Sequence, residues 1–382
     1  MKYRKFGRLS WRGPALGFGA MRLPVIGEER TNIDEAEVRR MIVYGIEHGV
    51  NYIDTGYRYH EGQSEVTIGK ILKDGYRDKV TLATKMPSWA IQSYGDFDRY
   101  LHEQLKRLHT DRIDFYLLHT LNRNLWPKLR DTGVLQWAER AIADGLIGHL
   151  GFSFHDDFPT FKEIVDAYDK WTMCQVQYNY LDTDYQAGTA GVKYAADKGL
   201  AVVVMEPLRG GRLTKNPPPQ VAELLAKSPR LRTGPERGLQ WVWDHQEVSL
   251  VLSGMSTMEQ IVENAALAER SEDNALSADE LELIDQVREL YHRLSPIPCT
   301  KCQYCMPCPN GVVIHRILEL YNEASMYNDT RIPRLRYQGY IGLKPEQRGD
   351  RCIECGQCET SCPQNISIMQ WLKEAHALLG KE

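Results

Sequence analysis

The sequence predicts an α/β protein in which a parallel (β/α)8 barrel at residues 1–294 precedes a smaller, mostly α-helical domain at 295–382. Three observations predict this architecture. Short apolar stretches alternate about eight times with stretches of helical periodicity. The chain of 382 residues is long enough for a barrel of roughly 250 residues and a second domain. Eight of the nine cysteines then gather behind the last of these units.

The first elements are expected to be a hairpin and a helix. Residues 1–20 alternate in polarity and contain four glycines, which predicts a hairpin that leads into a first strand. Apolar side chains recur at helical spacing from Val38 to Ile46, and Gly49 follows as a stop signal. This pattern predicts a helix over 34–48.

The next units repeat the order strand, helix, strand. Short apolar runs predict the strands, and apolar residues at helical spacing predict the helices between them. A helical stretch precedes each of the later strands. Strands are expected at 51–54, 80–84, 113–118, 147–152, 173–178, 201–205 and 249–252, with helices at 62–73 and 96–108.

The connection from Arg209 to Pro235 is long for a compact domain. It contains two adjacent glycines and a run of three prolines, with one short helical piece near 221–226. Connections of this length usually carry function. Helical periodicity returns at 277–294 and then meets two prolines, which predicts a domain boundary after residue 294.

Composition bears on partners and location. Hydrophobic residues make up 42% of the chain and the formal net charge is −4, which gives no reason to expect a nucleic-acid partner. The first residues include basic side chains but not the apolar core of a signal peptide, and no run approaches the 18 or so apolar residues of a membrane helix. We therefore expect a cytoplasmic protein without a membrane partner.

Four reactive side chains follow three successive predicted strands. The run NYIDTGYRYHEGQSE has Asp54 at the end of a buried strand and Tyr59 five residues later, before a helix. Lys85 and His119 end the next two strands. Taken singly, each is explained as well by a helix cap, a salt bridge or packing. Because the carboxyl ends of parallel strands meet at one face, the four together predict a reaction centre.

Asp54, Tyr59, Lys85 and His119 in this order, with Glu65 after the tyrosine, resemble the aldo/keto reductases from about residue 6 to residue 264. The resemblance implies that the hairpin closes the bottom of the barrel and that the chain interconverts a carbonyl compound and an alcohol with NAD(P)H. Hydride reduction leaves an alkoxide that needs a proton, and a tyrosine, whose pKa is ordinarily near 10, must be made easier to ionise. The implied roles are Tyr59 as proton donor, Lys85 as the cation that stabilises its phenolate, Asp54 as the holder of Lys85, and His119 as the group that orients the carbonyl or helps to donate.

The same resemblance implies a nucleotide site at later strand ends. GFSFH and CQVQYN contain the positions that bind the nicotinamide amide, VMEPLRGG matches the start of the pyrophosphate site, and SGMSTMEQIVEN matches the adenosine site. The implied cofactor residues are Ser153, Gln175, Glu206, Pro207, Leu208, Gly210, Arg212, Ser256, Gln260, Glu263 and Asn264.

Four positions depart from the family pattern. Phe154 stands where many members have asparagine, and Met205 replaces the aromatic residue that stacks on the nicotinamide. Met255 and Gln260 replace two basic residues that grip the 2′-phosphate, for which Arg212 is a candidate substitute. The usual electrostatic support for NADP is thereby reduced, but NADP stays the first expectation ahead of NAD. No motif in the chain secures a flavin.

The C-terminal cysteines form two runs. The second has gaps of two, two and three residues and a following proline, which is the bacterial ferredoxin pattern, and the first is one residue short of it. The tail resembles a ferredoxin-like domain with two [4Fe-4S] clusters, and together with the barrel it resembles the iron–sulfur branch of the aldo/keto reductases. Because the fourth cysteine of such a run serves the other cluster, the resemblance implies two ligand sets. These are Cys299, Cys302, Cys305 with Cys362, and Cys352, Cys355, Cys358 with Cys308.

Alternatives stay open at this point. Zinc held by paired Cys-x-x-Cys units is the alternative to clusters. Beside an NAD(P)H-dependent reductase of a small carbonyl or alcohol, a second hypothesis is a redox enzyme in which a flavin or a partner protein exchanges single electrons with the clusters. A third, an electron carrier on an inactive barrel, is disfavoured by the four intact reactive residues. Cys174, in a predicted strand, is expected to be a buried structural thiol.

Overall fold

The computed structural model describes residues 1–27, 29–214, 216–338 and 342–380. By its contacts the chain divides into two units. The barrel unit comprises Met1–Leu208 and Pro235–Ala275, and the helical unit comprises Arg209–Gly234 and Leu276–Glu382. The contacts therefore group the long connection with the C-terminal segment. The predicted domain boundary after residue 294 divides the sequence into two continuous segments, and it stays a prediction.

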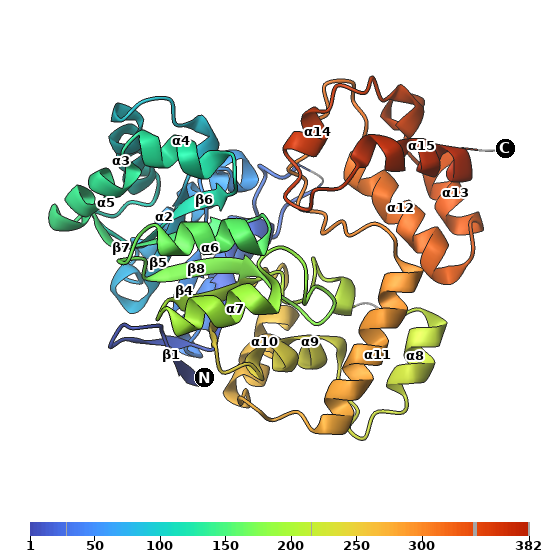
Figure 1. Ribbon diagram of the computed structural model, residues 1–382, viewed down its shortest axis with the longest axis horizontal. Helices are drawn as coiled ribbons and strands as arrows, with labels where there is room; N and C mark the ends of the chain where they lie inside the picture. Colours follow the sequence, from blue (N-terminus) through green and yellow to red (C-terminus); the bar gives the residue numbers. More distant parts are fainter. Residues whose placement is uncertain (28, 215, 339–341, 381–382) are drawn as a thin grey trace. The chain divides into compact units, whose positions relative to one another are not determined.

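The barrel unit contains a closed barrel of eight parallel strands, as the sequence predicts (Figure 1). Neighbouring strands follow each other in chain order, and the last strand pairs with the first to close the barrel. The strands are β3 (Leu16–Gly19), β4 (Tyr52–Asp54), β5 (Thr81–Met86), β6 (Ile113–Leu121), β7 (Ile147–Phe154), β8 (Met173–Gln177), β9 (Ala201–Met205) and β10 (Val248–Ser253).

An antiparallel hairpin precedes the barrel, formed by β1 (Tyr3–Lys5) and β2 (Arg12–Pro14). Phe6, in its turn region, is fully buried in a cluster with residues near the amino ends of the strands, among them Tyr52 and Phe115. The ring centroids of Phe6 and Phe115 are 5.1 Å apart. The hairpin thus closes the amino end of the barrel, and the carboxyl ends of the strands are left for a site.

Helices alternate with the strands, and Figure 1 shows α6 and α7 lying along the outside of the sheet at β8. The first helix begins where the Asp34 side chain accepts a hydrogen bond from the Glu37 backbone amide at 3.0 Å, and it ends before Gly49, whose φ of 83° suits only glycine well. The helices are α1 (Glu35–Glu47), α2 (Gln63–Leu72), α3 (Gly95–Arg107), α4 (Leu125–Asp131), α5 (Val134–Ala143), α6 (Phe158–Asp166), α7 (Gly188–Asp197), α9 (Gly234–Trp243) and α10 (Met258–Glu269).

The helical unit has its own apolar core. Ile317 and Leu318 of one helix and Leu372 of another are at most 1% exposed, and six of the eight clustered cysteines pack against this core. The Ser277 hydroxyl caps the longest helix in a capping box with Glu280. The helices are α8 (Pro219–Leu225), α11 (Ala278–Leu294), α12 (Ile314–Tyr327), α13 (Arg331–Gln338), α14 (Gln357–Thr360) and α15 (Ile368–Leu379).

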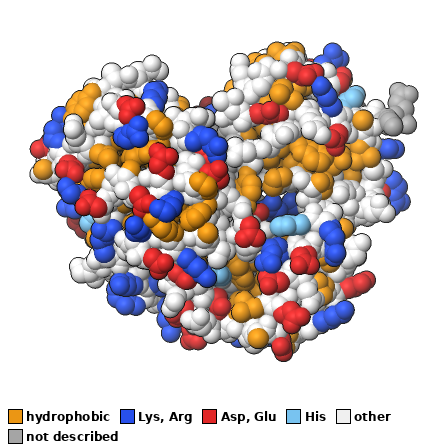
Figure 2. All heavy atoms as spheres, viewed as in Figure 1, with side chains coloured by type: hydrophobic (Ala, Val, Ile, Leu, Met, Phe, Trp, Pro, Cys, Tyr) orange, Lys and Arg blue, Asp and Glu red, His pale blue; other side chains and the backbone are white. Residues whose placement is uncertain are grey.

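The surface agrees with the charge balance of the sequence. Figure 2 shows acidic and basic side chains interspersed over the visible face of the barrel unit. Within the described part of the chain, each helix is too short or too polar to cross a lipid bilayer.

Candidate active site

A buried ion pair joins the ends of β4 and β5. The Lys85 Nζ donates to Asp54 Oδ1 at 2.6 Å and to the Thr55 carbonyl oxygen at 2.6 Å. The two charged side chains are 1% and 4% exposed. Burial raises the pKa of Asp54, and attraction to Lys85 opposes that shift. Since removing one partner would leave a buried charge unmatched, at a cost of about 3–5 kcal/mol, the pair fixes both side chains in place.

Tyr59 lies directly over this pair. It begins a 3-10 turn, Tyr59–Gly62, in which His60 and Glu61 have φ angles of 49° and 55°. Such left-handed angles are uncommon for residues with a side chain and occur often at functional sites. The turn brings the Tyr59 ring centroid to 4.7 Å from the Lys85 Nζ. The ammonium group is therefore close enough to stabilise a phenolate on Tyr59.

His119 completes the group near the end of β6. Its ring is edge-on to Tyr59 with centroids 5.9 Å apart, and Trp89 lies at 5.2 Å on another side. The pairing of β6 with β7 shifts just after Leu118, and Thr120 has a φ of 60°, so the strand is irregular where it presents His119. Burial, followed by repulsion from Lys85, lowers the pKa of His119 well below 6.5. The imidazole is therefore neutral at physiological pH.

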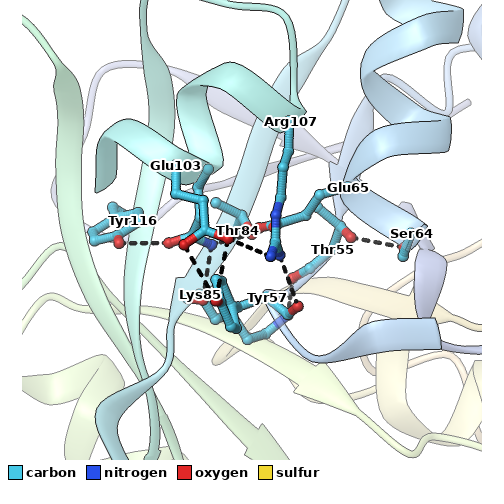
Figure 3. A network of polar contacts seen from close by, with 10 residues as sticks. Thr55, Tyr57, Ser64, Glu65, Thr84, Lys85, Glu103, Arg107 and Tyr116 are labelled. Carbon is cyan, nitrogen blue, oxygen red and sulfur yellow. Dashed lines mark hydrogen bonds and ion pairs between the residues drawn. The ribbon is translucent and has the colours of Figure 1, made fainter. Parts of the chain in front are cut away.

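Glu65 anchors a buried network beneath the Lys85 strand end (Figure 3). Its carboxylate is fully buried and accepts hydrogen bonds from the Thr84 hydroxyl at 2.6 Å and from the Gln104 amide nitrogen at 2.5 Å. The same amide nitrogen donates to the Lys85 carbonyl oxygen at 3.1 Å, and Tyr116 donates to the Gln104 amide oxygen at 2.6 Å. The network thus ties the backbone of Lys85 to α2 and α3.

Arg107 is the cation of this network. One guanidinium nitrogen lies 3.2 Å from Glu65 Oε2, and another lies 2.5 Å from Glu103 Oε1. The guanidinium also lies over the Tyr57 ring, 4.2 Å from its centroid. The fully buried Glu65 carboxylate is therefore neutralised by the Arg107 guanidinium, which is itself partly exposed to solvent.

The sequence analysis identified Glu65 but missed Gln104, Arg107 and Trp89. One signal was available for Gln104, because it stands in the apolar stripe of α3 with Phe97 and Leu101, where a polar residue needs a buried partner. No sequence signal marks Arg107 or Trp89.

The residues expected to bind the nucleotide in the barrel unit lie at the carboxyl ends of β7 to β10. The Ser153 hydroxyl accepts a hydrogen bond from the Thr120 amide at 2.8 Å. Gln175 is 2% exposed, and its amide oxygen has no hydrogen-bond partner among the described residues. A buried acceptor of this kind suits a donor group on a ligand, such as the amide of nicotinamide.

Arg22, a residue that the sequence analysis missed, links the predicted pyrophosphate and adenosine residues. Its guanidinium donates to Glu206 Oε1 at 2.7 Å, and its carbonyl oxygen accepts from the Ser256 hydroxyl at 2.7 Å. Gln260 Oε1 accepts from the Ser256 amide at 2.7 Å, and Asn264 Nδ2 donates to the Ser253 hydroxyl at 3.1 Å. Pro207 is buried, Leu208 is half-buried and Glu263 is exposed.

Two expected cofactor residues, Gly210 and Arg212, belong to the helical unit. There the Arg212 guanidinium lies 3.0 Å from the Met326 sulfur of α12. Phe154 is fully buried and packs edge-on against Phe161 of α6, with centroids 5.1 Å apart. Its side chain therefore faces the helix layer.

Cysteines of the first run lie near Cys362 within the helical unit. Burial raises the pKa of Cys299 to about 11, and the Cys362 thiol adds to the shift. Burial and then Cys302, Cys299 and Cys362 raise the pKa of Cys305. Cys362 therefore lies near the first run, as cross-ligation requires. Thiolates are the usual ligands of iron–sulfur clusters, so the donor set fits them, although among the described residues no three side chains are arranged around a single metal ion. Cys174 is fully buried, as expected.

Comparison with known proteins agrees with this geometry. A model of the aldo/keto reductase family matches residues 15–289, and a model of the 4Fe-4S dicluster domain matches 298–366. A solved aldo-keto reductase from Bacillus halodurans, in its holo form, is 27% identical with a TM-score of 0.62, over 75% of this chain and 96% of that chain. One from Klebsiella pneumoniae, in complex with NADP and acetate, is 25% identical with a TM-score of 0.61, over 75% of this chain and 95% of that chain.

A relative of similar sequence is the methylglyoxal reductase YeaE of Escherichia coli, 27% identical over 285 residues, which are 70% of this chain and 92% of the relative. Since the family model covers well over half of the sequence, the chain belongs to the aldo/keto reductase family and is an oxidoreductase of that type with a C-terminal 4Fe-4S dicluster domain.

Proposed function

We propose that this chain interconverts a carbonyl compound and an alcohol with NADPH or NADH. The observation that carries the proposal is the arrangement of the Lys85 ammonium, which is paired with Asp54 at 2.6 Å and lies 4.7 Å from the centre of the Tyr59 ring, beside His119. A nicotinamide cofactor, when bound, supplies the hydride that adds to the carbonyl carbon.

The residues of the chain then account for the proton. Tyr59 donates its hydroxyl proton to the alkoxide oxygen that forms, and Lys85 stabilises the phenolate that remains. Asp54 holds the Lys85 ammonium in position. The neutral His119 has one ring N–H to donate to the carbonyl oxygen, which orients the substrate. In the oxidative direction, the phenolate accepts the alcohol proton.

The nucleotide contacts form part of the proposal. Ser153 and Gln175 would hold the nicotinamide amide, and Glu206, Pro207, Leu208 and Gly210 the pyrophosphate side. Ser256, Gln260, Glu263 and Asn264 would hold the adenosine, and Arg212 is the candidate for the 2′-phosphate. The buried Gln175 amide oxygen supports the first of these assignments. NADP is proposed ahead of NAD, and the NADP in the Klebsiella pneumoniae structure supports that order.

We also propose two [4Fe-4S] clusters with the crossed ligand sets, Cys299, Cys302, Cys305 with Cys362, and Cys352, Cys355, Cys358 with Cys308. The match to a dicluster domain and the closeness of Cys362 to the first run support them. Clusters transfer single electrons, so a partner protein that exchanges electrons with them is a second functional candidate. A cytoplasmic location stays a prediction.

Replacement of Tyr59 tests the catalytic proposal. Tyr59→Phe removes the proton but keeps the ring, so the rate of carbonyl reduction should fall by about 10²-fold or more, while the Kd for NADPH changes little. Trp89→Phe, which alters a neighbour of His119 without removing a proton donor, serves as the control. Turnover of Tyr59→Phe near that of the unmodified protein would remove Tyr59 from the proposed role.

A further inference from the structure

The helical unit contains a cavity of about 280 Å³ whose lining residues all belong to that unit. Its walls come from the connection after β9, the segment around Cys299, and helices α11, α12 and α13. The basic residues that line it are Arg209, Arg212, Lys301, Arg316 and Arg336. The acidic ones are Glu319 and Glu323. The lining therefore has three more positive than negative side chains.

The two carboxylates are already engaged by cations of the wall. Glu319 Oε1 lies 2.5 Å from Lys301 Nζ, and Glu319 Oε2 lies 2.5 Å from Arg316 Nη1. Glu323 Oε1 lies 2.8 Å from Arg336 Nη1. Burial opposes ionisation of Glu319, but hydrogen bonds and attraction from Lys301 and Arg316 outweigh it and lower the pKa to about 2. Glu319 is therefore ionised at neutral pH, and one carboxylate is shared between two cations. The excess of positive charge in the wall remains.

Helix α12 presents its charged side chains on the one face that lines the cavity. Arg316, Glu319 and Glu323 are three and four residues apart on α12, so they lie on one face of that helix. Arg336 reaches the same face from α13, and Arg209, whose residue is 5% exposed, comes from the connection after β9. Cations held in a partly enclosed space raise the local concentration of anions.

The proposed iron–sulfur cluster of the first cysteine run does not account for the excess positive charge of the cavity wall. Only one of the eight clustered cysteines, Cys299, lines the cavity, so the cavity is beside the first cysteine run and is not the space for a cluster. Lys301 and Arg209 are the basic groups that act most on the Cys299 thiol. Arg316 and Arg336 belong to helices whose charged side chains face the cavity. These two cations pair with Glu319 and Glu323 within the cavity wall.

We propose that this cavity binds a small anion with two or more negative charges on carboxylate or phosphate groups. Arginine side chains from different elements offer paired N–H donors that match such groups. The volume lies just below the roughly 300–1,000 Å³ of ligand sites, which suits a small metabolite better than a dinucleotide. Arg212 is shared with the proposed nucleotide contacts, but the inference does not depend on the reductase activity.

The test is titration calorimetry on the full chain, purified anaerobically with its iron, at low salt. The probes are citrate and inorganic phosphate. Arg316→Gln should weaken binding by about tenfold or more, because a charge-assisted contact is lost. Since Arg316 pairs with Glu319, its loss can disturb α12, so Arg336→Gln on α13 is measured in parallel with the same expectation. Arg331→Gln, which changes an exposed arginine of α13 outside the cavity, should bind as the unmodified chain does.

Glu319→Gln gives a change of opposite sign. Removal of a carboxylate raises the excess positive charge, so binding of both probes should become tighter. The inference is overturned if neither probe binds at millimolar concentration, or if Arg316→Gln and Arg336→Gln both retain their iron and bind as tightly as Arg331→Gln. Displacement of the probes by NADPH would assign the cavity to the cofactor's phosphates and overturn the inference of a separate ligand.

Discussion

At the scale of single residues, Tyr59 and His119 are both able to donate a proton, and their surroundings distinguish their roles. The pKa of His119 is lowered well below 6.5, so the imidazole carries no extra proton to give at neutral pH. Tyr59 has the Lys85 ammonium 4.7 Å from its ring centre, where the charge favours loss of the phenolic proton. We therefore propose that the proton comes from Tyr59 and that His119 contributes a hydrogen bond.

The buried histidines also predict how stability depends on pH. Burial, chiefly, lowers the pKa of His155 from 6.5 to about 4. Between these two values the unfolded chain binds a proton that the folded chain does not, so the free energy of unfolding falls as the pH drops from about 6.5 to 4. In His155→Gln this fall in the free energy of unfolding should be smaller, by up to about 3 kcal/mol, because each pKa unit corresponds to about 1.4 kcal/mol.

Denaturant unfolding of His155→Gln at several pH values measures this effect. His102→Gln, at an exposed position of α3, is the control and should keep the pH dependence of the unmodified chain. His119 has a shift of the same sign, so part of the acid loss should persist in His155→Gln. An unchanged slope in that variant would contradict the assignment of the loss to His155.

At the scale of elements, α3 supports the reactive strand end. Arg107 compensates the fully buried Glu65, and removal of one member of a buried pair costs about 3–5 kcal/mol. We expect Arg107→Gln to lower the free energy of unfolding by roughly that amount, toward its low end because Arg107 is partly exposed. Arg99→Gln, on the same helix in an exposed pair with Asp96, should cost less than about 1 kcal/mol. Equal losses in the two variants, measured by urea unfolding, would show that the Glu65 network does not support the fold.

The elements also show what the sequence can and cannot predict. The strands were predictable because buried parallel strands are short apolar runs, and Asp54, Lys85 and His119 were predictable as a group because those strands end at one face. Arg107 was not, because its buried partner Glu65 lies on α2 and local periodicity contains no information on that contact. The apolar stripe of α3 marked Gln104 as a polar residue in need of a partner, but it did not identify Glu65 as that partner. Gly210 and Arg212 were assigned to the nucleotide from their place after β9, whereas the contacts group this connection with the helical unit.

At the scale of the whole molecule, the proposed function places two kinds of redox group in one chain. Nicotinamide gives two electrons as one hydride, and each cluster accepts one electron, so direct exchange needs a converter such as a flavin. No motif of the chain secures a flavin. We therefore expect the clusters to be structural or to be reduced by a separate partner protein, and to keep their visible absorbance when NADPH alone is added anaerobically.

The crossed ligand sets predict a specific loss of iron. The intact chain should contain about eight irons, and Cys362→Ala should retain about four, because only the first cluster loses a ligand. Cys174→Ala, at the buried cysteine outside the two runs, should keep all of them. Iron and sulfide analysis of anaerobically purified protein measures the difference. Stoichiometric zinc in a colourless protein would contradict the clusters themselves.

Isotope transfer tests the central claim most directly, namely that the barrel site moves a hydride between nicotinamide and a carbonyl carbon. NADPH deuterated at its transferring position is mixed with the anaerobic protein and a set of small carbonyl compounds, and the alcohol products are analysed by mass spectrometry. The proposed function predicts one deuterium on the carbinol carbon, with the visible absorbance of the clusters unchanged, and almost no product with Tyr59→Phe. Unlabelled products, or bleaching of the clusters by NADPH without labelled alcohol, would contradict it.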